Sequence, residues 1–334
     1  MTEYKLLING QMTNGDQTME VVNPATEEKI ADCPRASESQ LNDAVTAAKA
    51  AFPAWSKTSI DERKAVILKI ADVIEANSTE LAQLLTEEQG KPLEAATTEV
   101  FGMAAFCRYF TSLDLPIEVL EDSEGRKVEA HRNPLGVVGA IVPWNFPLML
   151  MAFKLPPALI AGNTLVLKPA PTTPLSSLRF AELIQNIVPA GVVNFITDAN
   201  DLGAALTAHP DIRKVSFTGS TATGAKVMAG AAGLLKRITL ELGGKSPNVI
   251  LKDADLNLAV PGAASAIFFN HGQCCCAGSR LYVEQEVFDE VTQGIVEEAG
   301  KIKVGDGFAE DTSMGPLVSQ EQFDRVTGFL DRGR

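Results

Sequence analysis

Alternating apolar and polar positions mark the start of the chain and then give way to a helical period. Residues 4–32 alternate around Asn-Gly and Asn-Pro turn signals, a pattern that predicts short antiparallel strands. From residue 37 to about residue 113, apolar residues recur at helical spacing, and Gly90 follows LAQLLTEEQ where a helix would end. We therefore predict a helical layer, in which two capping-box pairs begin helices: Ser37 with Gln40 and Ser59 with Glu62.

The next part of the chain alternates between strand-like and helix-like segments. PIEVLED and VEAHRNPLGVVGAIV flank the polar turn SEGRK and predict a long hairpin near residues 117–140. From there to about residue 252, β-rich runs alternate with helix-length segments, which predicts a doubly wound α/β layout of parallel strands and crossover helices. The runs are VVGAIV, TLVLKP, VVNFI, KVSF and RITLEL. A second α/β stretch begins near Pro247 and stops within the helical pattern EQFDRVTGFLDRGR.

The composition fits a globular enzyme or binding protein. Of the 334 residues, 46% are hydrophobic and 21% are charged, and the length favours two domains or one large α/β unit. Because the net charge is −13, we expect neither a nucleic-acid partner nor a membrane partner. The first residues lack a signal-peptide pattern, and the longest apolar run, LMLMAF, is too short to span a bilayer. Five cysteines without framework spacing indicate reduced thiols and a cytoplasmic protein.

Three of these cysteines are consecutive, in the stretch GQCCCAGSR (residues 272–280). Because neighbouring residues of a strand point to opposite faces, we do not expect three thiolates to converge on one zinc ion, and only three histidines are present to complete such a site. A disulfide between neighbours would strain the backbone. Chemistry alone leaves two interpretations about even: a nucleophilic thiolate, or small buried hydrophobic residues.

Two stretches resemble phosphate-binding loops without matching them. GSTATGAK (residues 219–226) has Ala225 where the P-loop requires Lys, and the GKS at residues 244–246 has Thr239 where the leading Gly belongs. The fingerprint G-x-G-x-x-G is absent after every predicted strand. The run KVSF nevertheless leads through a turn of small residues into a helix, whose free N–H groups can hold a phosphate.

Six motifs in order carry a resemblance to a known family: VPWNFP (142–147), LKPA (167–170), FTGS (217–220), LELGGKSPN (240–248), GQCCCAG (272–278) and MGPL (314–317). In these motifs the chain resembles the NAD(P)-dependent aldehyde dehydrogenase superfamily, from its N-terminal strands to its last residue. The resemblance implies that an aldehyde is oxidised to a carboxylic acid through a cysteine thiohemiacetal and a thioester. It also implies NAD or NADP as cofactor and a small-molecule aldehyde as substrate.

The resemblance implies a role for individual residues of these motifs. Cys275 matches the nucleophile, flanked by Cys274 and Cys276. Glu241 matches the general base, and Asn145 matches the amide that stabilises the oxyanion. The residues that match cofactor contacts are Trp144 in PWNFP, Lys168 and Pro171 at the adenosine ribose, Gly219 and Ser220 at the pyrophosphate, and Leu242 at the nicotinamide.

The chain also departs from the family pattern. Many NAD-preferring members carry a Glu where Pro171 stands, so both NAD and NADP remain open. Phe153 takes the place of an Arg that grips a substrate carboxylate in succinate-semialdehyde dehydrogenases. Together with Phe146, Met149 and Leu150, it favours an apolar or aromatic aldehyde. A CoA-acylating member is the alternative, although Glu241 argues for hydrolysis, and a catalytically silent interaction module is another.

The expected fold is α/β: a Rossmann-like, doubly wound parallel sheet, a bridging β-hairpin and a second α/β catalytic domain. We assign residues 1–114 and 135–241 to a dinucleotide-binding domain, 115–134 to an oligomerisation hairpin and 242–334 to a catalytic domain. The chain is shorter than the family's members, so we expect a C-terminally truncated member with an incomplete catalytic domain and little turnover. Full-length relatives are expected to be homo-oligomers, and the hairpin alone would leave an unpaired edge.

Overall fold

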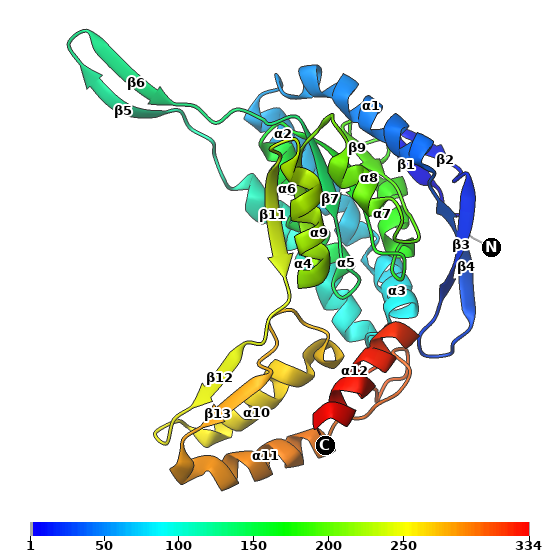
Figure 1. Cartoon of the computed structure of the whole chain (residues 1–334), viewed down its shortest axis with the longest axis vertical. Helices are drawn as coiled ribbons and strands as arrows, with labels where there is room; N and C mark the ends of the chain where they lie inside the picture. Colours follow the sequence, from blue (N-terminus) through cyan, green and yellow to red (C-terminus); the bar gives the residue numbers. More distant parts are fainter. Residues whose placement is uncertain (1–2, 334) are drawn as a thin grey trace.

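Five neighbouring strands of the largest sheet are parallel to one another (Figure 1). The computed structural model describes residues 3–333. The strand order is β11-β10-β7-β8-β9-β1-β2, in which β1 runs antiparallel to both of its neighbours. The parallel strands are the five runs predicted from the sequence: β7 (Val137–Ile141), β8 (Thr164–Lys168), β9 (Val193–Phe195), β10 (Ile212–Gly219) and β11 (Arg237–Leu242). The two remaining strands are β1 (Leu6–Ile8), which lies beside β9, and β2 (Gln11–Thr13), which forms the edge opposite β11.

Helices cover both faces of this sheet. Along β7, Val138 and Ala140 belong to one buried core, whereas Val137 and Ile141 belong to the other. The first core contains residues of α2 (Ile60–Ala76), α3 (Ser78–Gln89), α4 (Leu93–Thr111), α5 (Pro147–Ala152), α6 (Leu155–Ile160) and α7 (Leu175–Ile184). The second contains residues of α1 (Glu38–Trp55), α8 (Gly203–Ala208) and α9 (Thr221–Ala232). The α/β class is therefore confirmed, and the sheet is mixed: its five predicted strands are parallel, and β1 and β2 add antiparallel pairings.

The predicted start and stop signals of the N-terminal helices are confirmed. Both capping boxes form: the Ser37 hydroxyl accepts from the Gln40 N–H, and the Ser59 hydroxyl accepts from the Glu62 N–H. Gly90 ends α3 with φ at 90°, a left-handed conformation that favours glycine. The remaining N-terminal strands, β3 (Gln17–Val22) and β4 (Lys29–Arg35), form an antiparallel pair.

The predicted hairpin is shorter than the sequence indicated. It consists of β5 (Glu118–Ser123) and β6 (Arg126–Ala130) and projects away from the sheet, as Figure 1 shows. Its second arm ends at Ala130 because VVGAIV forms the buried strand β7 of the large sheet instead. The apolar side chains at the base and on the first arm are exposed: Ile117, Val119 and Leu120.

The chain leaves the large sheet after β11 and builds a second α/β unit, the C-terminal region (residues 247–333). Its sheet has two parallel strands, β12 (Pro247–Ile250) and β13 (Arg280–Val283). The helices are α10 (Leu256–Phe268), α11 (Phe288–Gly300) and α12 (Gln320–Gly333), with the short 3₁₀ helices η1 (Phe269–Gly272) and η2 (Gln285–Val287). Within residues 3–333, no helix combines the length and the apolar character that a membrane span requires.

Candidate active site

The three consecutive cysteines lie in a turn between η1 and β13, not in a strand. Their three Sγ atoms all lie within 4.8 Å of one another, and the Sγ atoms of Cys274 and Cys276 are 3.5 Å apart. The expectation that they would point to opposite faces was wrong, because that alternation applies only to extended backbone. Cys274 is half-buried against the first core, whereas Cys275 and Cys276 are exposed. Core filling therefore does not account for the exposed thiols.

A left-handed stretch of backbone leads into the cysteine turn. Asn270, His271 and Gly272 have φ values of 49°, 62° and 72°, a region that only glycine adopts freely. Such conformations cost free energy and persist where surrounding contacts hold them. The turn is thus positioned by tertiary contacts and not by the backbone's own preference.

Contacts with the loop before α12 supply that support. The Gly315 N–H donates to Nε2 of His271 (3.0 Å), and Nδ1–H of His271 donates to the Pro316 carbonyl (2.8 Å). The Val318 N–H donates to Oε1 of Gln273 (3.0 Å). Burial lowers the pKa of His271 to about 4, so the ring is neutral at pH 7 and can both donate and accept.

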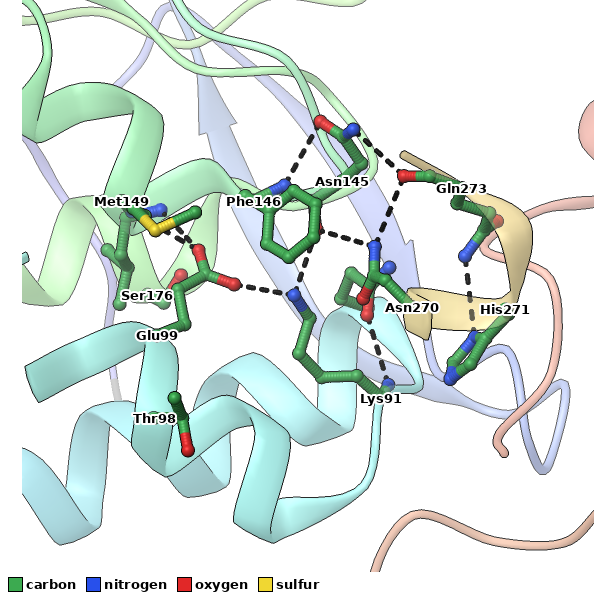
Figure 2. Close-up of polar contacts among 12 residues, drawn as sticks. Lys91, Thr98, Glu99, Asn145, Phe146, Met149, Ser176, Asn270, His271 and Gln273 are labelled. Atoms are coloured by element: carbon green, nitrogen blue, oxygen red, sulfur yellow. Dashed lines mark hydrogen bonds and ion pairs between the residues drawn. The ribbon is translucent and has the colours of Figure 1, made fainter. Parts of the chain in front are cut away.

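Asn145 connects the loop after β7 to the cysteine turn (Figure 2). Its Nδ2 donates to the Gln273 carbonyl (2.9 Å), directly before Cys274, and its Oδ1 accepts from the Phe146 N–H (3.1 Å). The Asn145 carbonyl accepts from Nδ2 of Asn270 (3.2 Å). The structure therefore places the Asn145 side chain against the residue that precedes the three cysteines.

A buried ion pair beneath Asn145 was not predicted from the sequence. Nζ of Lys91 lies 2.5 Å from Glu99 and donates to the Asn145 carbonyl (2.9 Å); the side chains of Lys91 and Glu99 are 1% and 2% exposed. The other Glu99 oxygen accepts from the N–H groups of Leu148 and Met149 at the start of α5. Burial lowers the pKa of Lys91, and the Glu99 charge opposes that shift. Figure 2 shows this pair beside the Phe146 ring, which lies 4.3 Å from the Lys91 nitrogen.

Glu241 is an exposed side chain near the end of β11 and pairs with Thr218 of β10. A buried lysine lies below it: Lys154 donates to Oγ1 of Thr218 (2.7 Å). Burial lowers the pKa of Lys154 to about 8, and the charge of Glu241 opposes this shift. The loop after Glu241 borders the cysteine turn, since a Cβ at Gly244 would lie 3.6 Å from the Cys275 carbonyl.

The six predicted cofactor residues lie in loops and at strand ends on the carboxyl edge of the sheet. Lys168 is buried and forms an ion pair with Asp198 (2.5 Å), so it is not a surface lysine. Ser220 caps α9, where its hydroxyl accepts from the Thr223 N–H. The other four are half-buried: Trp144 after β7, Pro171 after β8, and Gly219 and Leu242 as the last residues of β10 and β11. Ligands of open α/β sheets bind beyond this edge.

The four residues expected to favour an apolar aldehyde do not share one environment. Phe146 and Leu150 are buried in the first core, and the Phe146 ring stacks on Phe269. Phe153 is 42% exposed, with its ring edge against Phe106, and Met149 is partly buried. The burial of Phe146 and Leu150 is therefore explained by core packing.

These features define an α/β protein with an accessible thiol turn beside the carboxyl edge of a parallel sheet. A family model described as the aldehyde dehydrogenase family matches residues 11–334. An aldehyde dehydrogenase from Alternaria alternata is 43% identical over 98% of this chain, and the match spans 68% of that relative. An aldehyde dehydrogenase from Emericella nidulans is 41% identical over 98% of this chain and 68% of its own length. The chain belongs to the aldehyde dehydrogenase family.

Solved structures agree with this assignment. The NAD+ complex of an aldehyde dehydrogenase from Bacillus cereus superposes with a TM-score of 0.97 at 42% identity, over 99% of this chain and 70% of that one. An NADP-dependent enzyme from E. coli gives a TM-score of 0.94 at 36% identity, over 97% of this chain and 69% of that one. Both cofactor types thus occur among proteins of similar structure.

Proposed function

We propose that this chain oxidises an aldehyde to a carboxylic acid with NAD+ or NADP+, and that Cys275 is the nucleophile. The observation that carries the proposal is the position of the cysteine turn. Cys275 is exposed there, the preceding Gln273 carbonyl accepts from the Asn145 amide, and Gly244 of the LELGG segment lies alongside. A thiol, an amide donor and a strand-end carboxylate are the groups that acyl transfer through a thioester requires.

The first step is attack of the Cys275 sulfur on the aldehyde carbon. Burial and the neighbouring Cys276 raise the pKa of the Cys275 thiol, so a base must take its proton, and we assign this role to Glu241. The new oxyanion is stabilised by the Cys275 backbone N–H and by Asn145, whose NH₂ group donates one of its two protons to Gln273 and retains the other. Losing such a donor costs about 10²- to 10³-fold in rate.

The second half of the reaction releases the product. Trp144 and Leu242 would hold the nicotinamide, which would supply a hydride acceptor when bound, and Cys275 would then carry the acyl group as a thioester. Once the exposed Glu241 has passed the thiol proton to solvent, its carboxylate removes a proton from water. The water oxygen attacks the thioester, and the carboxylic acid leaves as the Cys275 sulfur is released as a thiolate. We assign this role to Glu241 because it lies near the end of β11, three residues before Gly244, which borders the cysteine turn.

The residues at the carboxyl edge fit a dinucleotide. Lys168 uses one of its three N–H donors on Asp198, so two remain for ribose hydroxyls. The first turn of α9, capped by Ser220, offers free N–H groups to a pyrophosphate. Gly219 precedes this turn, and a side chain at its position would collide with the Phe217 ring. We assign Trp144 and Leu242 to the nicotinamide side. Pro171 carries no charge to repel a 2′-phosphate, so NADP is accepted as well as NAD.

We retain the proposed division of the chain. Residues 1–114 and 135–241 would bind the dinucleotide, 242–334 would supply the nucleophile, and the hairpin 115–134 would join subunits. The exposed apolar side chains of the hairpin, among them Val119 and Leu120, support a role in association. Mixed-subunit exchange or sedimentation of a variant with polar residues at these two positions tests this part of the proposal.

Acyl trapping tests the reaction itself. The chain is incubated with an aldehyde and NAD+ or NADP+, quenched in acid, digested and mapped by mass. We expect the acyl group on Cys275 alone, its loss in Cys275→Ser, and its retention in the matched control Cys276→Ser. Addition of CoA distinguishes the hydrolytic from the acylating reaction, because only the latter yields acyl-CoA. Labelling of another cysteine, or none with either cofactor, would contradict the proposal.

A further inference from the structure

We propose that the sulfur atoms of Cys274, Cys275 and Cys276 together form a binding site for one soft divalent cation, with zinc as its type ion. The ion would be coordinated by the sulfur of Cys275 and would reversibly block the reaction of this sulfur with other molecules. The site is inhibitory or regulatory and not the seat of a resident cofactor. It does not depend on the proposed oxidation, because three sulfurs bind such an ion whether or not an aldehyde is a substrate.

The distances between the sulfur atoms fit a common metal ligand set. Tetrahedral zinc with Zn–S bonds of about 2.3 Å places its sulfur ligands about 3.8 Å apart. The Sγ atoms of Cys274 and Cys276 are already 3.5 Å apart, and all three Sγ atoms lie within 4.8 Å of one another. Adjustments of about 1 Å, which rotation about the side-chain bonds provides, complete the geometry.

The backbone of the turn is fixed independently of the thiols. The Ala277 N–H donates to the Cys274 carbonyl (3.2 Å), and the Gly278 N–H donates to the Ala266 carbonyl of α10 (2.9 Å). A Cβ at Gly278 would lie only 3.2 Å from the Ala266 side chain, so the turn is closely packed on this helix. The sulfurs therefore start close together in the apo chain, and binding an ion requires little ordering of backbone.

The remaining coordination position is open. Cys275 and Cys276 are exposed, so an ion held by the three sulfurs would reach solvent and take a water as its fourth ligand. His271, which precedes the cysteines, is not available, because both ring nitrogens are engaged by Gly315 and Pro316. Three thiolates without a nitrogen ligand select divalent ions such as zinc or cadmium over magnesium or calcium.

Binding releases protons and is therefore sensitive to pH. One divalent ion and three thiols give a complex of charge −1 and three free protons. The apparent affinity should consequently fall as the pH is lowered. The buried Lys91 ammonium, which interacts with the charge of Cys274, partly offsets the negative charge of the complex.

Direct metal titration of the reduced, chelator-treated chain tests the site. Zinc is titrated against a chromophoric competitor, and cadmium is followed by its thiolate charge-transfer absorption. We expect one ion per chain and a loss in affinity of at least about tenfold in both Cys274→Ser and Cys276→Ser. Cys33→Ser, which also removes one thiol but lies in the buried core, is the matched control and should bind as the parent does.

Three results would overturn the proposal. They are the absence of stoichiometric binding in the parent chain, retention of full affinity in Cys274→Ser or Cys276→Ser, and loss of affinity in Cys275→Ser alone, which would indicate a single-sulfur adduct. Circular dichroism of each variant separates misfolding from loss of a ligand. Acyl trapping on the metal-free chain is a separate measurement, so a failure of the metal site and a failure of the proposed oxidation are distinguishable.

Discussion

The sheet body (residues 3–242 without the hairpin) and the C-terminal region differ in the size of the buried core that supports their residues of the candidate site. Two extensive cores flank the large sheet, whereas the described C-terminal region has one small core. That core centres on Ile250, Val260, Ala263 and Val291. Apolar side chains on its helices remain exposed, including Val296, Phe323 and Phe329. The Asn145 amide therefore belongs to a region with extensive buried cores, whereas the thiols belong to a region with a small one.

The two regions meet where glycines permit close approach. The Leu93 N–H donates to the Gly307 carbonyl (2.9 Å), and a Cβ at Gly315 would overlap the Gly90 carbonyl. The same loop binds His271 and Gln273. The position of the thiols relative to Asn145 therefore depends on these contacts between regions as well as on the C-terminal core.

The largest difference between the regions should appear when a lysine is removed from an ion pair. Lys91→Met leaves the Glu99 charge buried without its partner, which costs about 3–5 kcal/mol of unfolding free energy. The matched change in the C-terminal region, Lys252→Met, breaks pairs with Glu284 and Glu286 in which Lys252 is 58% exposed. It should cost at most about 1 kcal/mol. Urea denaturation followed by circular dichroism measures both.

A double variant controls for the charge of Glu99. Lys91→Met with Glu99→Gln removes the uncompensated charge and should recover part of the lost stability. If Lys91→Met and Lys252→Met cost the same, the contrast in burial between the two regions does not govern their stability.

A smaller, pH-dependent effect should arise at the contact between the regions. The pKa of His271 is about 4 in the folded chain and 6.5 when the ring is exposed. Between pH 4 and pH 6.5, His271 is therefore protonated more readily in the unfolded chain than in the folded one. The contribution of neutral His271 is complete above pH 6.5 and is lost as the pH falls toward 4. Between pH 7 and pH 5 the loss should reach about 2 kcal/mol.

His271→Gln isolates this contribution, because Gln does not titrate and the other groups of the chain are unchanged. The difference in unfolding free energy between parent and variant should shrink as the pH falls from 7 to 5. A pH-independent difference would show that protonation of His271 is not coupled to unfolding. The buried Lys91, whose charge also disfavours the protonated ring, is present in both chains.

Local patterns account for the part of the fold that was predicted correctly. Strand runs, capping boxes and Gly90 depend on residues near one another in sequence, so periodicity and spacing reveal them. The hairpin was predicted too long because VVGAIV fits a hairpin arm and a buried parallel strand equally well. Only its partners β8 and β10 decide between these alternatives.

The site was predictable only as far as its motifs extend. Cys275, Glu241 and Asn145 stand in motifs. Lys91, in contrast, reaches Asn145 across 54 positions of sequence, and Glu99 is paired with Lys91, through a fold that no local pattern describes. A lysine just after the end of a helix and a glutamate within a helix are usually exposed, so nothing in the sequence marks Lys91 and Glu99 as a buried pair. The convergence of the three sulfurs was missed for a related reason, since the turn is held by contacts with residues 315–318.

The smallest effect should come from removing one methyl group from each core. Ile70→Val in α2 and Ile250→Val in β12 are chemically identical changes at positions that are 0% and 4% exposed. Ile→Val costs about 0.5–1.5 kcal/mol, and the cost rises with how poorly the surroundings can close the cavity. Ile70 lies in the extensive first core, so its cost should approach the upper value. Ile250 has few buried neighbours and a nearby surface, so its cost should approach the lower value. Hydrogen exchange of the α2 and β12 amides reports each region separately, and a larger loss of protection at β12 would reverse the comparison.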